Sequence, residues 1–175
     1  EDIIGLNGSG RAPLNVSSKL LKDKNFSVIP EDAVETITMP GAIAALESLN
    51  KKFSKMNLDT LIEPAISYAK NGIVVSPRVA FDWKYSYKNL KGIAKDYYLI
   101  NGKPYVEGSI FKSPGQAEVL KKISEKGSKG FYEGEVAKDF IDSLTKLGGV
   151  HSYNDLKSVA VEYVEPYKTN FGSYD

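Results

Sequence analysis

The sequence predicts a mainly α-helical chain with flanking β segments, an α+β class in which a helical lobe is inserted between strands of a sheet-based domain. A glycine-rich loop follows a short apolar start, a long central stretch carries apolar residues at helical spacing, and β-branched residues return near the end. We therefore expect three regions, namely a strand and loop portion over 1–39, a helical lobe over 40–158 and a returning strand over 159–175.

The composition is typical of a globular chain. Its 175 residues are 42% hydrophobic, which is enough for a buried core. The 23 Lys+Arg nearly match the 22 Asp+Glu, so the net charge of +1 predicts neither nucleic acid nor an anionic membrane as a partner. Cysteine is absent, which excludes disulfides, thiolate catalysis and cysteine metal sites. No apolar run approaches the roughly 20 residues of a transmembrane helix, and without a signal segment the compartment stays unassigned.

The first element is a loop that follows Ile3-Ile4, which we predict to be the end of a buried strand. Residues 5–13 read Gly-Leu-Asn-Gly-Ser-Gly-Arg-Ala-Pro, and their glycines permit positive φ and a close approach of the backbone to a ligand. Arg11 adds a fork of donors suited to a carboxylate. The alternative is a plain loop whose arginine pairs with a surface acid.

Periodicity predicts the elements that follow. Ser17 or Ser18 caps a short helix, and alternation over 33–38 predicts a strand that Pro40-Gly41 ends. Apolar residues at three- and four-residue steps then predict helices that cover about 40–53, 57–72, 79–90, 113–127 and 136–147. We expect their buried stripes to include Leu46, Leu61, Ile66, Leu120, Ile123, Phe140 and Leu144.

Turn and cap chemistry divides these helices. Asn101-Gly102 predicts a small hairpin inside the helical region, and Pro64 should kink or divide the helix that contains it. Ser152 and Asp155 have the spacing of a capping pair that opens one further turn. The chain stops at 171–175 in what reads as the middle of a strand, so we expect a piece of a longer protein.

Few residues have the spacing of catalytic groups. His151 is the single histidine, so a Ser/His/Asp triad or a histidine metal cluster would have to be built around this one residue, in a loop after Gly148-Gly149. Ser143 and Lys146 have Ser-x-x-Lys spacing but lie on an ordinary amphipathic helix without the companion motifs. Gly127-Ser128-Lys129-Gly130 has the Gly-x-x-Gly form by which KH domains hold a nucleic-acid backbone, although an interhelical turn explains it equally well. We expect no metal and no cofactor.

Five short motifs span nearly the whole sequence: Gly8-Ser9-Gly10-Arg11-Ala12-Pro13, Met39-Pro40-Gly41-Ala42-Ile43-Ala44-Ala45, Glu63-Pro64-Ala65-Ile66-Ser67-Tyr68-Ala69-Lys70-Asn71-Gly72, Gly130-Phe131-Tyr132-Glu133-Gly134, and Gly148-Gly149 followed by Asp155-Leu156. In this order they resemble the large subunit of γ-glutamyltranspeptidases. Each motif is weak alone, and the ordered set identifies the family better than it identifies a substrate.

The resemblance implies an N-terminal-nucleophile (Ntn) hydrolase, whose αββα sandwich would be incomplete here. Such a precursor cuts itself into two subunits, and the threonine exposed on the small subunit attacks a γ-glutamyl amide such as glutathione. The acyl group then passes to water or to an amine. No threonine of this chain lies in the family's Thr-x-His motif, so the resemblance implies that the nucleophile, and with it every catalytic residue, lies outside this chain. The small subunit would be its partner.

The resemblance also implies one substrate-binding position. The family's arginine that holds the substrate α-carboxylate normally lies in an Arg-Glu-x-Ala-Pro stretch, and alignment on Ala12-Pro13 puts Ser9 in its place. Arg11, two positions later, is the basic residue here. We therefore assign Arg11 and Ser9 as the candidate substrate-binding residues, and we keep a helical nucleic-acid-binding module that uses Gly127–Gly130 as the alternative function. Family members of this kind are commonly exported, but the sequence does not assign a compartment.

Overall fold

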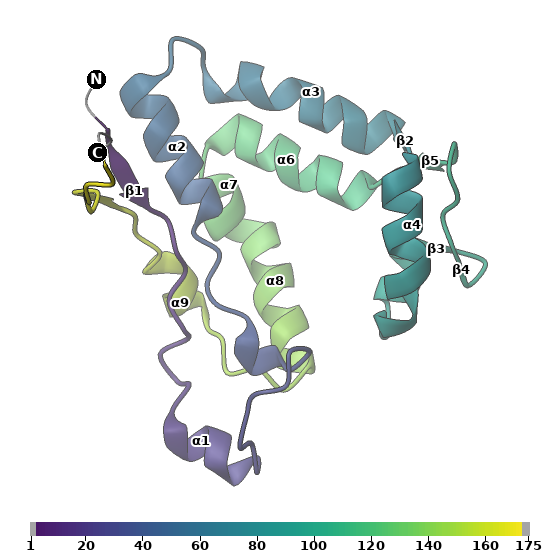
Figure 1. Ribbon diagram of the computed structural model, residues 1–175, viewed down its shortest axis with the longest axis horizontal. Helices are drawn as coiled ribbons and strands as arrows, with labels where there is room; N and C mark the ends of the chain where they lie inside the picture. Colours follow the sequence, from purple (N-terminus) through teal and green to yellow (C-terminus); the bar gives the residue numbers. More distant parts are fainter. Residues whose placement is uncertain (1–2, 173–175) are drawn as a thin grey trace. The chain divides into compact units, whose positions relative to one another are not determined.

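The structure is a computed structural model that describes residues 3–172 (Figure 1). About half of these residues are helical and the strands are short, which confirms the mainly helical class with flanking β segments. The chain forms two compact units, one made of Glu1–Leu58 with Lys126–Asp175 and the other of Asp59–Glu125. The first unit combines residues from all three predicted regions, which were 1–39, 40–158 and 159–175. Their assignment to a sandwich domain and an inserted lobe remains a prediction.

The first unit joins the two ends of the chain. Its elements are β1 (Gly5–Asn7), α1 (Ser18–Asp23), the 3₁₀ helix η1 (Val34–Thr36), α2 (Ala42–Phe53), α7 (Lys129–Tyr132), α8 (Gly134–Lys146), α9 (Tyr153–Lys157) and β6 (Glu162–Val164). β1 and β6 pair antiparallel, with Gly5 opposite Val164, and form a two-stranded sheet. The returning strand is thus present within 159–175, while the predicted last residues, 173–175, lie outside the described part.

The predicted buried strand at Ile3-Ile4 is wrong. β1 begins only at Gly5, and the side chains of Ile3 and Ile4 are 75% and 50% exposed. A two-stranded ribbon has few neighbours to cover it, so an apolar pair at its start need not be buried.

A small core in this unit packs residues of α7, α8 and α9 against the segment that precedes α2. It consists of Met39, Tyr132, Ala137, Ile141 and Leu156. The hydroxyl of Tyr132 donates to the carbonyl of Pro40 at 2.7 Å and accepts the N–H of Ala44 at 3.2 Å. These bonds hold the segment before α2 in place, and α2 begins at Ala42, two residues after the predicted first helical residue Pro40, with Gly41 at the N-cap.

The strand predicted over residues 33–38 is also wrong. Val34–Thr36 is a 3₁₀ helix, and the residues after it have no strand partner. The hydroxyl of Thr36 donates to the carbonyl of Ala33 at 2.7 Å, a local bond that competes with an extended ladder. β-Branched residues favour strands only where a neighbouring strand is available.

The second unit is built from helices and four short strands that form two antiparallel pairs. Its elements are α3 (Leu58–Asn71), β2 (Ile73–Val74), α4 (Pro77–Ser86), the 3₁₀ helix η2 (Tyr87–Asn89), α5 (Ala94–Tyr98), β3 (Leu99–Ile100), β4 (Lys103–Pro104), β5 (Ile110–Phe111) and α6 (Pro114–Lys126). β2 pairs with β5, and β3 with β4. The hairpin predicted at Asn101-Gly102 is confirmed, and Pro64 lies inside α3 without dividing it.

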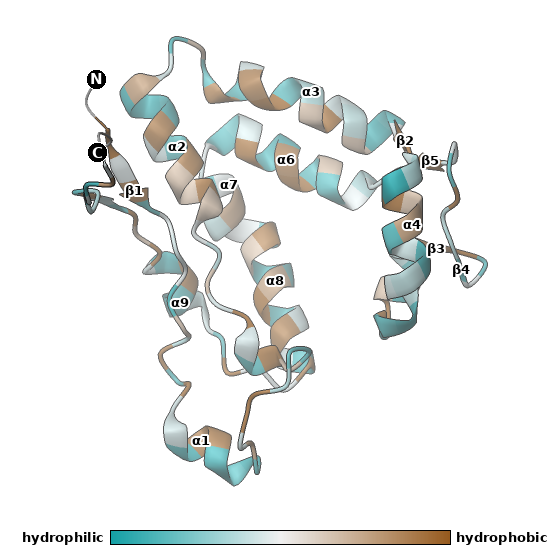
Figure 2. Ribbon diagram, viewed as in Figure 1, coloured by the Kyte–Doolittle hydropathy of each residue, from teal (hydrophilic) through white to brown (hydrophobic). Residues whose placement is uncertain are grey.

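The helices carry both hydrophobic and hydrophilic residues along their length (Figure 2). Only some of the hydrophobic residues that we predicted to be buried are buried. Ile123 and Leu144 are buried as expected, and Ile66, Leu120 and Phe140 are half-buried. Leu46 and Leu61 are 55% and 47% exposed, which contradicts their assignment to a core. Periodicity identifies residues that share a helix face, but it does not say what covers that face. Among the described residues, no helix combines the length and apolar character needed to cross a membrane.

Candidate functional site

The glycine loop packs its backbone directly against the segment that precedes α2. A Cβ atom on Gly10 would overlap the carbonyl oxygen of Met39, and one on Gly41 would overlap the carbonyl oxygen of Gly8. A Cβ on Gly8 would lie 2.7 Å from the Cβ of Ala45. Gly5, Gly8 and Gly10 do not have positive φ, which corrects our prediction, so the close approach that they permit is to the protein's own backbone.

The side chain of Arg11 projects from this loop into solvent. Its carbonyl oxygen accepts the N–H of Met39 at 2.9 Å, whereas its side chain is 86% exposed. The guanidinium lies 3.5 Å from the carboxylate of Glu162 on β6, whose side chain is 62% exposed. The ion pair of the plain-loop alternative is therefore present. A pair this exposed is weak, since water screens both charges, and it leaves the guanidinium accessible to another carboxylate.

Ser9 lies in the same loop, on the strand side of Arg11. Its N–H donates to the side-chain oxygen of Asn7 at 3.0 Å, which closes a short turn after β1. Ser9 and Arg11 both border a cavity of about 70 Å³, whose other lining residues include Met39, Asp155 and Val159. The structure thus brings the two sequence-predicted residues to one small cavity.

Asp155 also lines this cavity, and the residue is only 2% exposed. One of its oxygens accepts the N–H of Leu14 at 2.9 Å, and the other accepts the N–H and hydroxyl of Ser152 at 2.8 and 2.6 Å. Burial by itself raises the pKa of Asp155, but these donors outweigh burial and lower it below the ordinary aspartate value. The carboxylate is therefore an ionised anchor rather than a proton donor.

The sequence predicted one of the two contacts of the Asp155 carboxylate, the one with Ser152, and missed the other. The Ser152–Asp155 capping box is confirmed, because the two residues exchange the expected bonds at the start of α9. The bond to Leu14 spans 141 positions and has no local signal. Asp155 was part of the motif Asp155-Leu156, and that was the single hint that it does more than cap a helix.

His151 is a structural residue in the described chain. Its ring is 5% exposed, and Nε2 lies 2.7 Å from the carbonyl oxygen of Ile37. The carbonyl can only accept, so Nε2 carries the proton, and Nδ1 is buried with no partner among residues 3–172. Within the same residues, no three His, Cys, Asp or Glu side chains gather as a metal site would require.

Comparison with known proteins decides which family these features belong to. The sequence model of gamma-glutamyltranspeptidase matches residues 1–175. The chain belongs to the γ-glutamyltranspeptidase family. The glutathione hydrolase-like YwrD proenzyme of Bacillus subtilis (strain 168) is 32% identical over 174 residues, which cover 96% of this chain and 32% of that protein. The chain therefore spans about a third of the length of this curated relative.

Solved structures agree with this membership. The γ-glutamyltranspeptidase of Helicobacter pylori superposes with a TM-score of 0.88 at 32% identity, over 94% of this chain and 49% of that one. A cephalosporin acylase from Bacillus halodurans gives a TM-score of 0.90 at 32% identity, over 97% of this chain and 33% of that one. The described backbone is thus similar to that of a solved γ-glutamyltranspeptidase and to that of a solved acylase.

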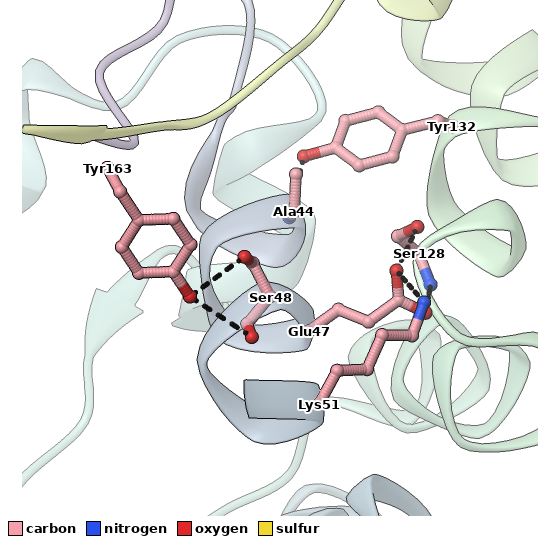
Figure 3. Close-up of polar contacts among 7 residues, drawn as sticks. All are labelled: Ala44, Glu47, Ser48, Lys51, Ser128, Tyr132 and Tyr163. Carbon is pink, nitrogen blue, oxygen red and sulfur yellow. Dashed lines mark hydrogen bonds and ion pairs between the residues drawn. The ribbon is translucent and has the colours of Figure 1, made fainter. Parts of the chain in front are cut away.

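The Gly127–Gly130 loop, our candidate for nucleic-acid binding, already holds a carboxylate (Figure 3). Glu47 of α2 accepts the N–H and hydroxyl of Ser128 at 3.2 and 2.8 Å, and it pairs with Lys51 at 3.1 Å. Burial raises the pKa of Glu47, but the Ser128 and Lys51 donors lower it below its ordinary value. A phosphate at this loop would compete with an ionised side chain, so in this γ-glutamyltranspeptidase family member the loop serves to join α2 to α7.

Proposed function

We propose that this chain is part of the large subunit of an amidohydrolase that transfers γ-glutamyl groups, and that Arg11 binds the α-carboxylate of the donor. The observation that carries the proposal is the position of Arg11, whose backbone is held against Met39 while its guanidinium is open to solvent. A guanidinium fork makes two parallel bonds to a carboxylate, and charge assistance makes each of them stronger than a neutral hydrogen bond.

Glu162 suits this role as a resting partner. It holds the guanidinium at 3.5 Å through a single exposed contact, and a bidentate donor carboxylate offers a better partner at the same position. Binding therefore replaces one weak ion pair by a stronger one, without leaving a buried charge behind.

The acyl-transfer step itself uses a residue outside this chain. The threonines present, Thr36, Thr38, Thr60, Thr145 and Thr169, are not followed by the x-His of the family motif. In the proposed reaction, a threonine at the start of the small subunit attacks the γ-glutamyl carbonyl, its own amino group serving as the base, and releases the amine. Water or an amine acceptor then takes the acyl group. Similar proteins named as proenzymes support a precursor that is cut into two subunits.

The proposal is tested with the full-length protein and two donors that differ only in the carboxylate. One donor is a γ-glutamyl anilide, and the other is the 4-aminobutyryl anilide, which has the same chain and amine but no α-carboxylate. We expect self-cleavage into two subunits, release of aniline that an amine acceptor accelerates, and a kcat/KM at least about tenfold higher for the γ-glutamyl donor. The chain of residues 1–175 alone should release no aniline. Equal kcat/KM for both donors, or turnover by the isolated chain, would contradict the proposal.

A further inference from the structure

The backbone next to Arg11 is hydrogen-bonded to a distant part of the chain through the buried carboxylate of Asp155, and we call this bond to Leu14 the tie. Three residues after Arg11, the N–H of Leu14 donates to the carboxylate of Asp155 at 2.9 Å. The other carboxylate oxygen is occupied by Ser152, whose N–H and hydroxyl hold α9 in its capping box. The carboxylate is thus oriented by α9 and offers its remaining oxygen to the loop.

This bond adds a second anchor to the loop close to Arg11. The carbonyl of Arg11 itself accepts the Met39 N–H, and two to three residues further along the chain Pro13 is buried and Leu14 bonds to Asp155. The Arg11 side chain lies in solvent and touches one exposed carboxylate, so its surroundings do little to hold it. The place of the guanidinium therefore depends on where the backbone is fixed.

We propose that Asp155 is a positioning residue that holds the Leu14 amide and thereby fixes Arg11 where it binds the donor carboxylate. This inference rests on the proposed function of Arg11. Asp155 does not touch the donor, and its effect travels through the four-residue backbone from Leu14 to Arg11. A carboxylate bound by Arg11 is held in the ground state and the transition state alike, so loss of the tie should raise KM and leave kcat nearly unchanged.

Leu14 offers a way to remove the tie without touching α9. It is the second residue of the turn closed by the Val16 N–H and the Pro13 carbonyl at 3.0 Å, the position where proline is favoured. Leu14→Pro therefore deletes the N–H donor while it keeps a compatible backbone. Leu14→Ala loses a similar amount of an exposed side chain but keeps the N–H, which makes it the matched reference.

The experiment compares these variants in the full-length, self-cleaved protein with the γ-glutamyl and 4-aminobutyryl anilides. Relative to Leu14→Ala, Leu14→Pro should raise KM for the γ-glutamyl donor by about fivefold or more, with kcat changed less than about twofold and no change for the 4-aminobutyryl donor. In an Arg11→Ala background the same substitution should add nothing, because the two residues act as one unit.

A second pair of variants approaches the tie from the other side. Asp155→Ala should reproduce the KM increase, and Asp155→Asn, whose single amide oxygen can accept the Leu14 N–H or the Ser152 N–H but not both, should recover only part of it. This pair decides the matter if Leu14→Pro does not fold.

The outcomes separate the inference from the function on which it rests. If Arg11→Ala raises KM but Leu14→Pro and Asp155→Ala do not, the positioning role is overturned and the function of Arg11 stands. Equal losses with both donors, or a further loss in the Arg11→Ala background, mean general damage and also overturn it. If Arg11→Ala itself changes neither parameter, both the inference and the proposed role of Arg11 are overturned.

Discussion

At the scale of single residues, the sequence left two interpretations of Arg11 open, a carboxylate-binding residue and a loop residue paired with a surface acid. Arg11 pairs with a surface acid, Glu162, as a plain loop would have it, yet the pair is so exposed that it contributes little to stability. The sequence located the arginine because it lies in a motif, Gly-Arg-Ala-Pro, but the identity of its partner depends on the β1–β6 pairing, which brings residues far apart in the chain together.

Replacing Glu162 tests whether the pair is a resting contact. Glu162→Gln removes the competing charge, so KM for the γ-glutamyl anilide should fall by about twofold to threefold, while the melting temperature changes by less than about 2 °C. Steady-state kinetics and thermal unfolding of the full-length protein measure the two effects. A KM that rises would show that Glu162 helps to hold the donor instead of competing with it.

At the scale of elements, the sequence predicted best where the deciding bonds are local. Ser17 caps α1 and Ser152 forms a capping box with Asp155, as their spacing indicated. The hairpin at Asn101-Gly102 was equally predictable, because both residues take positive φ, the geometry that Asn-Gly favours. The predicted strand that ends before Pro40 failed for the opposite reason, since a strand needs a distant partner that no local pattern specifies.

The hairpin turn gives a matched test at this scale. Gly102 has φ of +77°, and a Cβ there would meet nothing within 4 Å, so Gly102→Ala costs backbone strain alone, about 1 kcal/mol. Gly115 in α6 is equally open but does not have positive φ, so Gly115→Ala should be neutral or stabilising by up to about 1 kcal/mol. Chemical denaturation of both variants measures the difference. Equal destabilisation by the two would mean that the turn geometry is not the cause.

At the scale of the whole molecule, helical content and family were accessible from sequence, whereas the packing between distant segments was not. Apolar spacing cannot tell that Leu46 and Leu61 are exposed, because that depends on what lies opposite each helix face. The bond from Leu14 to Asp155 likewise joins segments 141 residues apart. The site was predicted as two residues of one loop, and the structure adds the second segment, α9, that holds this loop.

The measurement that tests the account most directly is kcat/KM of Arg11→Ala in the full-length, self-cleaved protein. Loss of a charge-assisted bidentate pair costs about 1.5–3 kcal/mol, and about 1.4 kcal/mol is a factor of ten, so kcat/KM for the γ-glutamyl anilide should fall by more than about tenfold. Arg11→Lys should recover only part of this loss, because an ammonium cannot make the two-pronged contact. Self-cleavage should proceed normally in both variants. Near-normal kcat/KM in Arg11→Ala would contradict the account and leave Arg11 as the surface partner of Glu162.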